Sequence, residues 1–273
     1  MRLCPVLICF LLAPILLSQE LPQASSPASP SPYVQREEKQ FNFFPGGKIE
    51  ISAAASGSLK IVGWQKGSVR VEIEKIVYYL PPDQAKTETD KSRVRVRWGQ
   101  TSATIQTTES QSAKMEVNLT VYVPGYKTDM RAKLNRGDFS IEGVNGWIEA
   151  SIAAEGSLEA KSMSGYFSGN TLHGDISVDM TGKRWDGLEF AALTQHGSAS
   201  LVLPLDFSAA LQLETRNGKI VVDYPPQVVQ GETVPPEIVI RKNSQSLKAS
   251  VGDGGAPIKL VTYSGNVTLS KKE

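Results

Sequence analysis

Hydrophobic and polar residues alternate along most of the chain after residue 40, and no long window shows apolar residues at helical spacing. The alternation recurs as a five-residue phrase of glycine, polar, apolar, polar and apolar residues. A strand directs successive side chains to opposite faces, so the third and fifth residues are predicted to point inward. Glycine comes first because the chain must turn there before each strand. The phrase begins at Gly47, Gly57, Gly67, Gly137, Gly156, Gly174, Gly197, Gly218 and Gly265.

The spacing of the phrases in the C-terminal half indicates a repeat architecture. Successive phrase glycines from Gly137 to Gly218 lie 19, 18, 23 and 21 residues apart. A period near 20 residues is typical of a solenoid, in which each repeat forms one rung. Further glycines at Gly146, Gly165 and Gly182 predict a second corner and two strands in each rung. We therefore expect an all-β fold, a flattened single-chain β-solenoid whose facing sheets lie about 10 Å apart.

The first segment, residues 1–18, is predicted to be a signal peptide, with its end open up to residue 24. Arg2 precedes an apolar run from Leu3 to Leu17, which is shorter than the roughly 20 residues of a membrane-spanning helix. Residues 19–39, rich in serine and proline, are predicted to be a disordered linker. We expect an exported protein in the periplasm, at the cell surface or secreted, with no integral membrane segment after signal cleavage.

The folded part is predicted to contain two regions. Residues 40–130 form an N-terminal β-strand region, with its clearest strands at Ser68–Tyr78, Arg93–Trp98 and Met115–Val123. Leu80–Lys91, between the first two of these strands, is predicted to be a solvated loop. Residues 131–273 form the β-solenoid repeat region. Because an open row of strand donors and acceptors must be covered, we expect the N-terminal strands to cap or extend the first rung.

Cysteine and charge content exclude several kinds of chemistry. Cys4 and Cys9 are the only cysteines, and both lie in the predicted signal peptide. The exported chain is therefore expected to have no disulfide, no thiolate nucleophile and no cysteine metal ligand. Removal of Arg2 takes the formal net charge from +1 to about zero, which favours neither nucleic acid nor an anionic membrane as a partner.

The glycine phrases also resemble those of a known protein family. The resemblance rests on Gly57-Ser-Leu-Lys-Ile-Val-Gly-Trp64, Val69-Arg-Val71, Val121-Tyr-Val-Pro124, the Gly-Asp phrases at Gly137 and Gly174, Leu201-Val-Leu-Pro204, Thr215-Arg-Asn-Gly218 and Thr262-Tyr-Ser-Gly265. From Phe41 to the end, the chain resembles the bacterial putative-adhesin family of unknown function, whose members are exported and similar to adhesin-head domains. The resemblance implies a fold, and it assigns no functional residues.

Two histidines occupy the same position in consecutive repeats, because His173 precedes Gly174 and His196 precedes Gly197. Rungs about 4.8 Å apart would place the two imidazoles side by side, with Glu155 one rung earlier. Such a column could bind zinc or perform acid–base chemistry; alternatively, these are solvated residues before a turn. We predict no bound metal and no cofactor, and His173, His196 and Glu155 are the candidate metal ligands.

Three arginines, Arg93, Arg95 and Arg97, alternate with apolar residues and share one face of a predicted strand. A row of guanidinium groups is suited to binding an anionic polysaccharide or phosphate. The alternative is cross-strand charge pairing with Glu72 and Glu74, which lie on the outward face of the strand expected beside it. We expect at least one such ion pair, and the three arginines are the candidate binding residues.

Catalytic chemistry would require acidic or basic groups gathered on one face. The outward column after each phrase glycine contains two carboxylates, Asp138 and Asp175, two rungs apart. Their predicted separation of about 9–10 Å suits neither a retaining glycosidase pair nor a tight metal site. Common hydrolase and phosphate-loop motifs are absent from the sequence. We therefore expect no catalytic residues and no enzyme activity.

The predicted function is that of a non-catalytic exported envelope or secreted protein, an adhesin-like scaffold or binding surface of unknown ligand. Two alternatives remain open: a carbohydrate-active β-helix enzyme, and a periplasmic sensing or regulatory partner. The ligand is not specified by the sequence. An envelope polysaccharide or another envelope protein are the partners considered, and nucleic acid is not expected.

Overall fold

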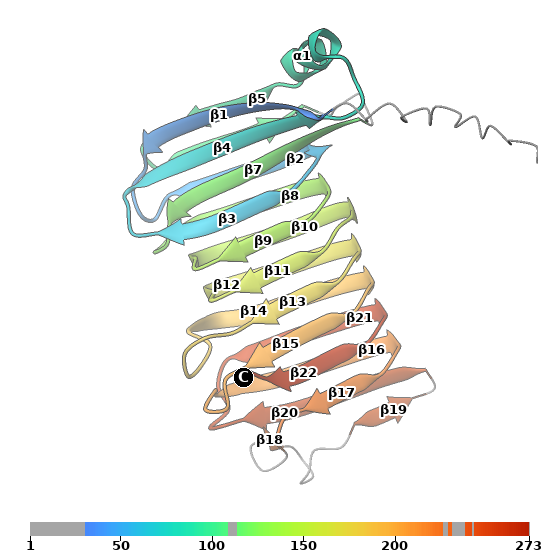
Figure 1. Cartoon of the computed structure of the whole chain (residues 1–273). Coiled ribbons are helices and arrows are strands. Elements are labelled where there is room, and N and C mark those ends of the chain that lie inside the picture. Colours follow the sequence, from blue (N-terminus) through green and yellow to red (C-terminus); the bar gives the residue numbers. More distant parts are fainter. Residues whose placement is uncertain (1–30, 109–113, 226–228, 231–237, 242, 273) are drawn as a thin grey trace, which may run out of the picture.

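The computed structural model describes residues 31–108, 114–225, 229–230, 238–241 and 243–272. The predicted signal peptide and the linker up to residue 30 lie outside these ranges. The described chain forms two β-sheets, with one hydrophobic core whose residues come from both (Figure 1). A short helix, α1 (Pro82–Lys91), lies at the N-terminal end of the assembly. No helix in these ranges is long and apolar enough to cross a membrane.

The predicted all-β class is confirmed, and most strand pairings are parallel. The ten-stranded sheet contains, in spatial order, β1 (Tyr33–Asn42), β4 (Ser68–Val77), β7 (Met115–Pro124), β3 (Leu59–Trp64), β9 (Phe139–Glu142), β11 (Leu158–Lys161), β13 (Ile176–Asp179), β15 (Ala199–Leu203), β22 (Val267–Lys271) and β17 (Ile220–Asp223). The twelve-stranded sheet contains β18 (Val229–Gln230), β20 (Ser244–Val251), β16 (Ala209–Asn217), β21 (Pro257–Ser264), β14 (Gly187–His196), β12 (Ser164–His173), β10 (Asn145–Glu155), β8 (Asp129–Arg136), β2 (Lys48–Ser56), β6 (Ser102–Thr107) and β5 (Val94–Trp98), while β19 (Val239–Arg241) pairs with β20.

From β6 to β17, and again in β2/β3 and β21/β22, consecutive strands alternate between the two sheets. We call each such pair of consecutive strands, one from each sheet, a rung. In spatial order the rungs are β6/β7, β2/β3, β8/β9, β10/β11, β12/β13, β14/β15, β21/β22 and β16/β17. Neighbouring rungs pair in parallel in both sheets. Antiparallel strands extend the stack, with β1, β4 and β5 at one end and β20 at the other.

The spatial order of the rungs differs from the order along the chain at both ends. The C-terminal rung, β21/β22, lies between β14/β15 and β16/β17, whereas the sequence period predicted that the Gly218 rung would follow the Gly197 rung. At the other end, β2/β3 lies between β6/β7 and β8/β9. Each of these rungs is therefore hydrogen-bonded on both sides, away from the exposed ends of the sheets.

The predicted division at residues 130 and 131 does not correspond to a break in the structure. It falls inside β8, and parallel rungs already begin with β2/β3 and β6/β7. The N-terminal strands therefore extend the stack within the same two sheets. Between β3 and β6 the chain forms β4, α1 and β5, so the N-terminal rungs do not follow the period of about 20 residues.

The backbones of neighbouring rungs approach closely at one corner, which explains why each five-residue phrase begins with glycine. Gly137 has a φ of +123° and Gly156 a φ of +148°. A Cβ at Gly156 would overlap the carbonyl oxygen of Gly137, and one at Gly137 would overlap that of Gly57. The same relation continues through Gly174, Gly197, Gly265 and Gly218. Only glycine fits where successive rungs turn in direct contact.

The second corner is built in the same way, with one difference from the prediction. Gly146 and Gly165 stack as expected, but Gly187 continues the column in place of Gly182. A Cβ at Gly182 would meet nothing within 4 Å. The four residues between these two glycines belong to a loop in which Trp185 is buried against Phe190, at a ring-centroid distance of 5.4 Å.

The residue after each corner glycine, together with Asn118, which follows Val117 on β7, forms a ladder visible only in spatial order. It reads Asn118, Ser58, Asp138, Ser157, Asp175, Ser198, Asn266 and Lys219. Each Asn or Asp side chain accepts the backbone N–H of the next residue in that ladder, at 2.7–3.0 Å. These polar side chains therefore satisfy the turning backbone.

Buried threonine side chains form hydrogen bonds to the same corner from the core side. The hydroxyl groups of Thr171, Thr194, Thr262 and Thr215 each donate to the carbonyl oxygen of the corner glycine one rung away, at 2.7–2.9 Å. All four side chains are buried. Because a buried hydroxyl without a partner is costly, each threonine favours one stacking position for its neighbour.

The predicted inward residues of the phrases form the core. Phe139, Leu158 and Ile176 are each 1% exposed, and Ile220 is 6% exposed, which confirms the prediction. Val222 is the exception at 38% exposed, because β17 is the last strand of its sheet.

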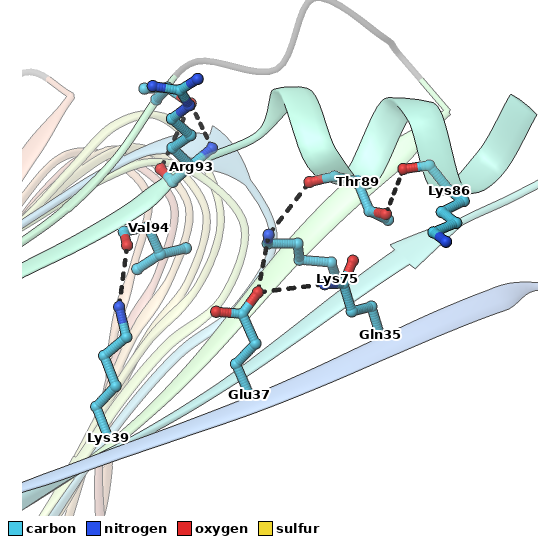
Figure 2. A network of polar contacts seen from close by, with 9 residues as sticks. Gln35, Glu37, Lys39, Lys75, Lys86, Thr89, Arg93 and Val94 are labelled. Atoms are coloured by element: carbon cyan, nitrogen blue, oxygen red, sulfur yellow. Dashed lines mark hydrogen bonds and ion pairs between the residues drawn. The ribbon is translucent and has the colours of Figure 1, made fainter.

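The N-terminal end of the stack is closed by a polar network beneath α1 (Figure 2). The Lys75 side chain is only 6% exposed, and its Nζ lies 3.1 Å from Glu37 Oε1 and 3.2 Å from the carbonyl oxygen of Thr89 on α1. Lys39 Nζ donates to the carbonyl oxygen of Val94 at 3.4 Å and so connects β1 to β5. The inward face of β1 is therefore polar where that of the later rungs is apolar.

Two local predictions in this region are wrong. The disordered linker was expected to reach residue 39, but Tyr33–Asn42 pairs with β4 along its whole length. The solvated loop predicted at Leu80–Lys91 instead contains α1, which begins with a proline and buries Ala85 and Thr89. In both cases, packing against β4 orders a segment that is too polar to indicate burial by itself.

The corner geometry yields a first prediction. Gly156→Ala should lower the free energy of unfolding by more than about 3 kcal/mol, since it adds backbone strain and a collision with Gly137. Gly182→Ala is the matched control, because its φ is also positive, at +79°, but its surroundings are open. The control should cost about 1–2 kcal/mol. Equal losses of unfolding free energy in the two variants, measured by urea unfolding, would contradict the role of close backbone approach at Gly156.

The core arrangement yields a second prediction. Leu158→Ala should cost about 2–5 kcal/mol, because it leaves a cavity between rungs that are packed on both sides. A thermal or urea melt measures this loss. A melt indistinguishable from that of the unaltered protein would contradict the burial of this position.

Candidate functional site

The histidine column forms in register despite the loop that precedes β14. His173 lies opposite His196 and beside Glu155. The two imidazole rings stack, with centroids 4.7 Å apart and planes 12° apart. The loop residues lie before β14, and a register shift between Gly165 and Tyr166 accommodates one further residue, Leu188. The structure thus brings the three candidate metal ligands into one column.

The same column has the features of a solvated surface. Both histidines and Glu155 are exposed. Within the described ranges, no group of three or more histidine, cysteine, aspartate or glutamate side chains could hold a metal ion. Exposed rings also lack the outer hydrogen-bond partners that orient metal ligands.

This geometry yields a third prediction. Elemental analysis of the purified protein should find no stoichiometric zinc, because two stacked, exposed imidazoles provide too few fixed ligands. One zinc per chain that disappears in a His173→Ala, His196→Ala double variant would contradict this expectation and would support the enzyme alternative.

The predicted pairing of the arginine row with Glu72 and Glu74 is wrong. Those glutamates lie on β4 of the ten-stranded sheet, where Arg70 binds Glu72 at 3.0 Å and Arg36 binds Glu74 at 2.7 Å. The arginine row instead belongs to the twelve-stranded sheet. Strand β5 pairs with β6, and the expected neighbour lies across the core.

The arginine row, residues Arg93, Arg95 and Arg97, is exposed on the outer face of the last described strand of its sheet. Arg95 lies opposite Gln106 and Arg97 opposite Thr104, both neutral. None of the three guanidinium groups forms an ion pair within the part of the chain that the structure describes. The row is therefore a cationic surface without internal neutralisation.

A second feature of this outer face was missed by the sequence analysis. Trp147 on β10 stacks on Tyr166 on β12, with ring centroids 4.0 Å apart and planes 22° apart. We call this pair the aromatic platform. A signal was present, because each aromatic residue directly follows a second-corner glycine, Gly146 or Gly165. The sequence analysis considered the glycines and not the residues after them.

Polar contacts fix the orientation of Trp147. Its indole Nε1 donates to Glu149 Oε1 at 3.2 Å, and its backbone N–H donates to Asp129 Oδ1 at 3.0 Å. Arg131 Nε donates to Glu149 Oε2 at 2.7 Å. Hydrogen bonds from Arg131 and then Trp147 lower the pKa of Glu149, so this carboxylate stays charged.

Beside the platform lies a shallow groove of about 690 Å³ over β12, β14 and β21. We call it the outer groove. Ser168 and Ala191, which are opposite each other in register, provide small side chains there. Tyr166 belongs to both the platform and the groove lining. The polar side chains that line the outer groove are Ser168, Asn170, Glu189, Gln195 and Lys259.

These five polar groups have no hydrogen bond or ion pair within the described residues. By contrast, the neighbouring charges on β8 and β10 already pair with each other, as Arg131 does with Glu149. The outer groove therefore presents donors and acceptors that the fold itself does not use.

The carboxylates considered for catalysis have structural partners. Asp138 accepts the backbone N–H of Ser157 at 3.0 Å, and Asp175 accepts that of Ser198 at 2.7 Å. Each therefore supports a turn between adjacent rungs.

No family model and no curated protein matches this chain. Several solved structures are similar to it. They include a putative cell adhesion protein from Clostridium sporogenes (10% identity, TM-score 0.44, covering 87% of this chain and 100% of that one), a putative adhesin from Bacteroides fragilis (11%, 0.25, 87% and 97%) and a putative lipid binding protein from Parabacteroides distasonis (12%, 0.30, 87% and 97%). Proteins described as adhesins are thus among the structural neighbours, as the sequence motifs predicted. At these TM-scores the likeness carries no argument about what this chain binds.

Proposed function

We propose that the chain is a flattened β-solenoid that acts as a non-catalytic, adhesin-like binding scaffold. Its binding surface is the outer face of the twelve-stranded sheet, and its ligand is an envelope or extracellular polysaccharide. One observation supports this choice above the others. That face has both the arginine row and the outer groove, whose polar groups have no partners in the described chain.

Rigidity of the face supports a binding role. Its strands are paired on both sides from β6 to β16, and the corner glycines, side-chain caps and threonines fix their stacking. A surface already ordered before binding loses little conformational entropy when a ligand attaches. A repetitive polymer suits a repetitive surface, since neighbouring strands lie about 4.8 Å apart along it.

The exported location is part of the proposal. It rests on the apolar run between Leu3 and Leu17 and on the restriction of cysteine to that segment, which lies outside the described residues. The enzyme alternative is less favoured, because Asp138 and Asp175, the two carboxylates considered for it, bind backbone amides.

The arginine row yields a fourth prediction. The protein should be retained on a heparin or polyphosphate column, because exposed guanidinium groups bind sulfate and phosphate groups. Retention should decrease as the salt concentration increases, because salt screens the attraction between these charges. Replacing Arg93, Arg95 and Arg97 together by glutamine should abolish this retention.

A control variant that loses the same number of positive charges separates the effect of the arginine row on retention from the effect of net charge. Arg36, Lys161 and Lys272 are ion-paired, at 2.7, 2.6 and 2.7 Å, and their combined replacement by glutamine should leave most of the retention. Equal loss in both triple variants would contradict a specific role for the arginine row.

A further inference from the structure

The aromatic platform is an exposed apolar surface with a fixed orientation. Trp147 is 47% exposed even though it stacks on Tyr166. The indole N–H and the backbone N–H of this residue are both bound, to Glu149 and Asp129. Trp147 is therefore a fixed support for one face of Tyr166, and the other face of Tyr166 can receive a ligand in the groove with little further loss of side-chain freedom. An aromatic ring also provides a large contact area and a flat face.

The outer groove continues from the platform and supplies the complementary polar groups. Ser168, Asn170 and Gln195 each donate and accept hydrogen bonds. Glu189 contributes an acceptor, and Lys259 contributes a donor. Polar groups that converge on a concave surface and lack internal partners are the usual means of orienting a bound small molecule.

The charges of the groove indicate the class of ligand. One carboxylate and one ammonium group give no net charge, whereas a nucleic acid would require an excess of cations. A protein partner would require a largely apolar, desolvated centre, whereas this groove presents five polar side chains without internal partners. A sugar ring matches both parts of the site, because it has an apolar C–H face and a rim of hydroxyl groups that donate and accept.

We propose that the aromatic platform and the outer groove form a binding site for a neutral glycan. The C–H face of one sugar ring stacks on the face of Tyr166 that Trp147 leaves free, and its hydroxyl groups bind Ser168, Asn170 and Glu189. The next sugars cross β14 toward Lys259. Strands about 4.8 Å apart have a spacing similar to the length of one sugar residue. This inference rests on the proposed function and specifies its ligand.

The test uses the full-length protein and an array of neutral oligosaccharides derived from cellulose, xylan, chitin, laminarin and starch. At least one of these probes should bind, and binding should change the fluorescence of the exposed Trp147. With that oligosaccharide in titration calorimetry, Trp147→Ala, which removes the ring that holds Tyr166 in place, should weaken binding at least tenfold. Trp98→Ala is the matched control, because Trp98 is also exposed, at 55%, and also stacks on an aromatic ring, Phe41, but lies outside the groove.

A second variant keeps the test decisive if the first is unstable. Asn170→Ala removes an exposed side chain that contacts no internal partner, so the melting temperature should not change while the affinity falls at least fivefold. Binding that is unchanged in both variants would overturn the inference, as would a wild-type protein that binds no neutral oligosaccharide. A wild-type protein that binds no neutral oligosaccharide but is still retained on heparin would contradict this inference and leave the proposed function standing. A wild-type protein that binds neither neutral oligosaccharides nor heparin would contradict both proposals.

Discussion

The close contact between corner backbones is the constraint on which the rest of the structure depends. Successive rungs turn at glycines such as Gly137 and Gly156, where a Cβ would overlap the carbonyl oxygen of the next rung. This contact fixes the rungs in register, so the inward residues coincide as a core and the outward residues coincide as columns. The stacked histidines and the aromatic platform are both consequences of that register.

Much of this arrangement could be predicted from the sequence because the phrase is local. The alternation around Leu158 specifies which face is buried, and the glycine before it specifies the turn. The pairing of β10 with β12 and of β12 with β14 follows from chain order, so the histidine column could be predicted residue by residue. The spatial order of the end rungs could not, because it depends on long-range pairing that a sequence period does not record.

The errors at the candidate site have the same origin. Glu72 and Arg95 occur on long strands close together in the sequence, yet those strands belong to opposite sheets. Likewise, Lys259 lies beside Ala191 only because β21 inserts next to β14. The outer groove is therefore completed by a strand more than sixty residues away in the chain. A sequence pattern could indicate Trp147 and Tyr166, which stand in equivalent positions, but it could not indicate that β21 completes the outer groove.

The insertion of the C-terminal rung is thus the claim on which both the fold and the site rest, and cross-linking tests it directly. Ser198 lies beside Asn266 in the structure, whereas simple chain order would place it beside Lys219. In a protein without its two native cysteines, mild oxidation should form a disulfide in a Ser198→Cys, Asn266→Cys variant. It should form none in a Ser198→Cys, Lys219→Cys variant. Mass spectrometry that finds the bridge in the second variant and not in the first would contradict the account.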